Sequence, residues 1–141
     1  MSQSNAETVL KIATLALMII GGLVLAMASH PSVAFLPNLF FDLVFLQFDG
    51  AEKATEPVSR LLAALSGGAF VGFGFTFWQI ITKLMPREPQ LAKSMMTSGL
   101  LGWFAVDSTG SMLSGAWFNA VLNCVILACF LVPLGSIKPQ Q

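Results

Sequence analysis

The sequence carries little charge. Only 10% of its 141 residues are Asp, Glu, Lys or Arg, while 55% are hydrophobic. A soluble domain carries about 25% charged residues. The seven basic and seven acidic side chains cancel, so no basic surface points to a nucleic acid. This composition is typical of a chain embedded in lipid, and we expect a single all-α transmembrane domain over residues 1–141.

Residues that carry chemistry are also scarce. The chain has one histidine, His30, and two cysteines, Cys124 and Cys129, which are five positions apart in an apolar run. That spacing matches neither a redox pair nor a zinc site, so we expect both thiols to be buried as small hydrophobes. No nucleotide-binding, HExxH or Ser-His-Asp pattern occurs. The sequence therefore predicts no catalytic residue, no metal and no cofactor, and an enzyme is not expected.

The longest uncharged run lies in the middle of the chain, where 22 residues from Leu61 to Thr82 carry no formal charge. As a helix, this run spans roughly 33 Å, about the thickness of the hydrocarbon core of a bilayer. Small residues recur every fourth position on one face of this helix, and they let a second helix approach closely in lipid. The predicted helix-packing face consists of Ala64, Gly68, Gly72 and Thr76.

Four spanning helices are predicted, at about residues 9–29, 57–85, 90–113 and 115–135. The third is the least apolar, because only 13 uncharged residues separate Lys93 from Asp107. If it crosses, one of these two charges lies inside the membrane edge. In the first predicted helix, Ala26-Met27-Ala28 resembles a signal-peptide cleavage site. Glu7, however, weakens the positive region that such a peptide needs. We expect this segment to be retained.

The apolar segment at about residues 33–48 is broken by Pro37, Asn38 and Asp42, and is too short to span. We expect an interfacial or re-entrant segment that covers the outer end of the bundle. A lid over a cavity, or a docking surface for a partner, is the alternative. The distribution of Lys and Arg predicts that both termini are cytoplasmic. Lys11, Lys83, Arg87, Lys93 and Lys138 fall on one side, against Lys53 and Arg60.

One candidate site stands out, around the carboxylate of Asp107. An ionisable group in a spanning segment is costly and by default indicates a functional site. A short turn after residue 113 makes an antiparallel hairpin, which brings Asn119 and Asn123 to the depth of Asp107. Ser111 lies one turn away, and Arg60 is the only cation able to approach. We expect a polar intramembrane cluster of these five residues. It either holds helices together or binds a solute; alternatively, Asp107 ends its helix in water.

Three pieces of the sequence together show a resemblance. They are Asp49-Gly50 with Pro57 and Arg60, then Ser66-Gly67-Gly68 with Gly72, and then Val106-Asp107-Ser108 with Ser111, Gly115-Ala116-Trp117 and Asn119. Over about residues 45–135, this pattern resembles a group of short, four-helix bacterial inner-membrane proteins. The resemblance implies four helices and a bacterial inner (plasma) membrane. It implies no activity.

These features predict a small polytopic membrane protein that acts by binding rather than by chemistry. We expect an accessory subunit of a membrane assembly, or a homo-oligomer, whose partners are the lipid bilayer and other membrane-protein subunits. The alternative is a small permease or channel subunit in which Asp107 handles a proton, an ion or a small polar solute. A lipid- or quinone-binding enzyme subunit is a second alternative.

Overall fold

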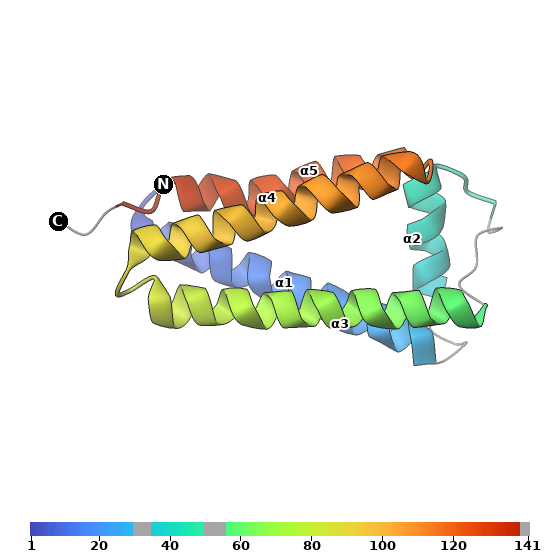
Figure 1. Ribbon diagram of the computed structural model, residues 1–141, viewed down its shortest axis with the longest axis horizontal. Helices are drawn as coiled ribbons and strands as arrows, with labels where there is room; N and C mark the ends of the chain where they lie inside the picture. Colours follow the sequence, from blue (N-terminus) through green and yellow to red (C-terminus); the bar gives the residue numbers. More distant parts are fainter. Residues whose placement is uncertain (30–34, 50–55, 139–141) are drawn as a thin grey trace.

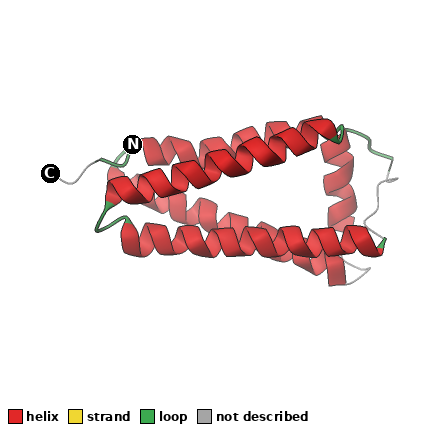
Figure 2. Ribbon diagram, in the orientation of Figure 1, coloured by secondary structure: helices red, strands yellow, loops and turns green. Residues whose placement is uncertain are grey.

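The computed structural model describes residues 1–29, 35–49 and 56–138, and every regular element in them is helical (Figures 1 and 2). The elements are α1 (Gln3–Ser29), α2 (Phe35–Phe45), α3 (Pro57–Gln79), the π-helical turn η2 (Ile80–Leu84), α4 (Pro89–Leu113) and α5 (Trp117–Gly135). The predicted all-α fold is therefore confirmed. His30 and Lys53 lie outside the described residues.

Three helical segments are long and apolar enough to cross a membrane. They are Gln3–Leu25, Pro57–Leu84 and Trp117–Gly135. The predicted fourth span, α4, has the length but not the apolarity, because serines, threonines, Lys93 and Asp107 interrupt its apolar residues. The chain is thus a plausible multi-pass membrane protein with three candidate spans.

The long helices form two antiparallel pairs. Figure 1 shows α1 beside α3, and α4 beside α5, while α1 also contacts α5. The N-terminus, the turn between η2 and α4, and the end of α5 lie at one end of the bundle. At the other end α2 runs across the long helices and packs against α5 and α1. The turn between η2 and α4 and the turn between α4 and α5 therefore lie at opposite ends of the bundle.

The core lies where the two pairs meet. Phe77 of α3 is 2% exposed, and its ring centroid lies 5.5 Å from that of Phe130 in α5, edge to face. The turn η2 inserts one extra residue into the helix, and the N–H of Met85 donates to the carbonyl of Ile80 at 2.8 Å. This insertion keeps Ile81 and Met85, both 1% exposed, on the inner side of the bundle.

Glycines bring α1 and α3 into backbone contact. A Cβ placed on Gly21 would lie 2.7 Å from the carbonyl oxygen of Gly67, and one placed on Gly67 would lie 2.7 Å from that of Gly21. Seven residues further along α3, a Cβ on Gly74 would lie 2.5 Å from Cγ of Met18. At Gly21 and Gly67 the backbone leaves no room for a side chain, and together with Gly74 these residues define what we call the glycine seam.

The predicted packing face of α3 is not the one used against α1. Gly68, Gly72 and Thr76 are exposed and Ala64 is half-buried. Among the described residues, no atom beyond the adjoining backbone of α3 lies within 4 Å of a Cβ added at Gly68 or Gly72. We call this face the open face, since its glycines and Thr76 are exposed in the described part of the chain; its packing against another chain stays a prediction.

The prediction for the two cysteine thiols meets a different outcome. Cys124 and Cys129 were expected to be buried, but both are exposed on the outside of α5. That prediction was wrong, because an apolar run in a membrane helix faces outward as well as inward. Within the predicted segment 33–48, α2 ends in a Schellman motif, with Leu46 at a φ of 56°. Residues 33 and 34 of that segment lie outside the described residues.

Candidate functional site

A tight turn joins α4 to α5 and determines which side chains face each other. Gly115 has a φ of +80°, a region that favours glycine. The N–H of Ala116 donates to the carbonyl of Ser111 at 2.8 Å. The N–H of Gly115 donates to the carbonyl of Met112 at 3.2 Å. This Schellman motif ends α4 and reverses the chain at once, so residues at equal distances from the turn lie opposite each other.

The side chains opposite each other form a hydrogen-bonded group that we call the polar cluster: Asp107, Ser108, Ser111, Asn119 and Asn123. The Asn123 amide donates to Oδ2 of Asp107 at 2.6 Å and to Oγ of Ser108 at 3.1 Å. The Asn119 amide donates to the same Oδ2 at 3.2 Å and to Oγ of Ser111 at 2.7 Å. The cluster therefore joins α4 to α5 through four side-chain hydrogen bonds.

The donors of the polar cluster are largely used within it. Each asparagine amide has two N–H groups, and both are engaged in Asn119 and in Asn123. The Ser111 hydroxyl accepts from Asn119 and donates to the backbone carbonyl of Asp107 at 2.7 Å. Such mutual satisfaction is what a polar contact between helices in lipid requires.

The two oxygens of the Asp107 carboxylate differ. Oδ2 accepts from two amides, which offset part of the cost of removing a carboxylate from water. Oδ1 has no donor among the described residues. The side chain is half-buried, whereas Asn123 is only 3% exposed. The cluster thus has a buried, satisfied side and one carboxylate oxygen that is open to a further partner.

The four hydrogen bonds of the cluster do not involve Arg60. It lies in the first turn of α3, its side chain is exposed, and α3 packs mainly against α1. The donors to the Asp107 carboxylate come from α5 instead. Hydrogen bonds therefore join four of the five predicted residues, and the approach of Arg60 to the cluster stays a prediction.

Two sequence-based expectations about the cluster are changed by the structure. The alternative in which Asp107 ends its helix is wrong, because α4 continues for six residues to Leu113. Ser108 was not predicted, yet it is 8% exposed and accepts from Asn123. The signal for Ser108 was present, since it is a hydroxyl residue next to Asp107 at the depth of Asn123 in the hairpin.

The arrangement supports hydrogen bonding and proton exchange at one carboxylate, and little else. Among the described residues, no group of three His, Cys, Asp or Glu side chains is placed to hold a metal ion. The two hollows described on the chain are lined by apolar side chains and a single cysteine, and neither borders the polar cluster.

Comparison of the chain with protein-family models, curated proteins and solved structures gives no match. The resemblance to short bacterial membrane proteins therefore stays a prediction.

Proposed function

We propose that α4 is a fourth membrane span. Its 25 residues extend about 37 Å, enough to cross a bilayer. It runs antiparallel to α5, which is apolar enough to cross, and the two are joined by a short turn (Figure 1). Three of its polar residues, Asp107, Ser108 and Ser111, are hydrogen-bonded to side chains of α5. A helix paired in this way has fewer unsatisfied groups to expose to lipid.

In this arrangement α2 is an interfacial helix at the outer end of the bundle, and both termini are in the cytoplasm of a bacterial cell. The crossing direction of α2 suits a helix lying in the membrane plane (Figure 1). Its exposed apolar side chains, and those just after it, suit the headgroup boundary: Leu39, Phe40, Leu46 and Phe48. The excess of Lys and Arg at the opposite end supports the orientation.

The function that this geometry supports best is binding to other membrane proteins, as a homo-oligomer or as an accessory subunit. The observation that carries the proposal is that α3 has two small-residue faces, and the described residues of the chain fill one of them. The glycine seam is filled by α1, whereas the open face presents Gly68 and Gly72 with clear space above them. Small residues on an exposed spanning helix let another helix approach closely. We take a second copy of this chain as the first partner to test.

The test is the oligomeric state of the full chain in lipid nanodiscs loaded at varied protein-to-disc ratio, measured by mass photometry. Gly68→Leu with Gly72→Leu places bulk on the open face and is expected to convert oligomers to monomers. Gly22→Leu is the matched control, because Gly22 is also an exposed helical glycine with nothing within 4 Å, but on α1. A wild-type chain that stays monomeric and recovers no membrane-protein partner from mild detergent contradicts the proposal.

A second candidate function, in a small permease or channel subunit, is favoured by the open Oδ1 of Asp107. A carboxylate with one unsatisfied oxygen can bind a proton or a cation. Asp107→Asn separates the two functions. A transport role predicts that proton flux in reconstituted vesicles is lost while the protein stays folded. A purely structural role predicts a lower melting temperature and no flux in either form.

A further inference from the structure

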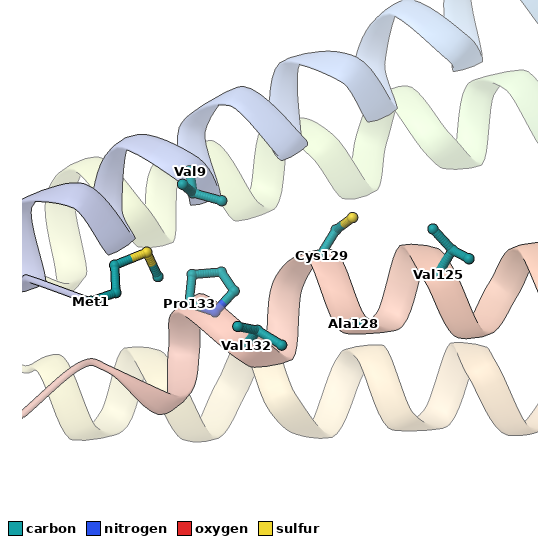
Figure 3. Close-up of a pocket in the computed structure, with 7 residues that line it drawn as sticks. All are labelled: Met1, Val9, Val125, Ala128, Cys129, Val132 and Pro133. Carbon is teal, nitrogen blue, oxygen red and sulfur yellow. The ribbon is translucent and has the colours of Figure 1, made fainter.

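An open groove runs between α1 and the C-terminal half of α5, on the outside of the bundle (Figure 3). Its volume is about 440 Å³. Val9 and Met1 line one side, and residues of α5 line the other, from Val125 to Pro133. These nine residues of helix extend about 12 Å along the bundle axis. The lining is apolar apart from the Cys129 thiol, so the groove suits a hydrocarbon chain rather than a polar solute.

The groove ends at the end of the bundle where most of the basic side chains lie. Lys138 follows Pro133 by five residues, and the turn between η2 and α4 lies at the same end of the bundle (Figure 1). The basic side chains in or near this end are Lys11, Lys83, Arg87, Lys93 and Lys138, against the acidic side chains of Glu7 and Glu88. In the described part of the other end, Arg60 stands against Asp42, Asp49 and Glu56. Charge therefore differs in sign between the two ends.

We propose that this groove binds one acyl chain of an anionic phospholipid, with the headgroup phosphate among the basic side chains at its end. Basic side chains at the cytoplasmic edge of spanning helices attract anionic headgroups, and an adjoining apolar groove adds contact with the tail. The groove opens on the lipid-facing side of α1 and α5, both apolar enough to cross a membrane, so a lipid reaches it without crossing protein. The site is independent of the open face of α3 and of the polar cluster.

The experiment is native mass spectrometry of the full chain released from nanodiscs of equimolar palmitoyl-oleoyl phosphatidylglycerol and phosphatidylcholine. The wild-type protein is expected to retain one phosphatidylglycerol in preference to phosphatidylcholine. Ala128→Phe fills the groove and is expected to remove the retained lipid. Because Ala128 is exposed, the added ring need not displace the core. Val121→Phe, at an exposed position of α5 that does not line the groove, is the control and should retain the lipid.

The charge is tested separately from the groove. Lys138→Gln is expected to lower the preference for phosphatidylglycerol by about fivefold, the effect of one basic side chain near a headgroup. Lys138→Arg keeps the charge and should keep the preference. Circular dichroism melts check that every variant is folded.

Three results overturn the proposal. Equal retention of the two lipids by the wild-type protein contradicts the preference for an anionic headgroup. Unchanged lipid retention in Ala128→Phe contradicts binding of the acyl chain in the groove. A disulfide-linked dimer that forms on oxidation, and is abolished by Cys129→Ala but not by Cys124→Ala, shows that a second copy occupies the groove instead of lipid.

Discussion

The two antiparallel helix pairs are held together in opposite ways. At the glycine seam, α1 and α3 approach until backbone atoms touch. At the polar cluster, α4 and α5 are joined by amide, carboxylate and hydroxyl groups. The hydrophobic effect does not drive helices together in lipid, so close van der Waals contact and hydrogen bonds remain. We therefore expect atoms added at the glycine seam to destabilise the α1–α3 pair, and polar atoms removed from the polar cluster to destabilise the α4–α5 pair.

The largest expected effect is at the centre of the glycine seam. Gly67→Ala adds a methyl group 2.7 Å from the carbonyl oxygen of Gly21 and 2.8 Å from the backbone N of Leu25, so the helices must separate. We expect a loss of about 2–3 kcal/mol in the free energy of unfolding, measured in detergent by circular dichroism. Gly68→Ala, one residue away on the open face, is the control and should leave stability unchanged or slightly higher. An equal loss of stability in Gly67→Ala and Gly68→Ala contradicts close backbone contact at the glycine seam.

The next effect is at the polar cluster, where removing atoms matters. Asn123→Ala deletes both hydrogen bonds from this amide and leaves the Asp107 and Ser108 oxygens without it. We expect a loss of about 1–3 kcal/mol in the same assay. Val121→Ala, which shortens an exposed side chain two residues earlier, should cost less than about 0.5 kcal/mol. If Asn123→Ala is no more destabilising than this control, the cluster does not hold α4 to α5.

A smaller effect is expected at the other glycine of the seam on α3. Gly74→Ala meets Cγ of Met18 at 2.5 Å, but the nearest backbone atom, the Thr14 carbonyl oxygen, is 3.5 Å away. A methionine side chain can change rotamer, whereas a backbone cannot. We expect a cost of about 1 kcal/mol, below that of Gly67→Ala, in parallel melts. A larger cost for Gly74→Ala than for Gly67→Ala contradicts the distinction between backbone and side-chain contact.

The polar cluster was accessible to sequence reasoning because the turn between α4 and α5 is short. A short turn leaves one antiparallel register, so the depth of Asp107 relative to Asn119 and Asn123 follows from counting residues. Arg60 could not be placed in the same way, because it lies at the end of α3 that is far from the turn between η2 and α4. The helix α3 packs mainly against α1, and α2 and two longer connections separate these two helices along the chain.

The packing face of α3 could not be read from sequence for a related reason. Small residues occur on two neighbouring faces, one with Gly67 and Gly74 and the other with Gly68 and Gly72. Both satisfy the small-residue rule. Which face α1 takes depends on where Gly21 falls along α1, and this is a property of the folded pair.

The central claim is that α4 crosses the membrane with the polar cluster inside it, and the direct test is the sidedness of its two ends. Single cysteines at Arg87 and Ser114, in a background of Cys124→Ala and Cys129→Ala, are labelled with a membrane-impermeant maleimide in intact spheroplasts and in inside-out vesicles. The account predicts that Ser114→Cys is labelled only from outside and Arg87→Cys only from the cytoplasmic side. Labelling of both positions from the same side contradicts it.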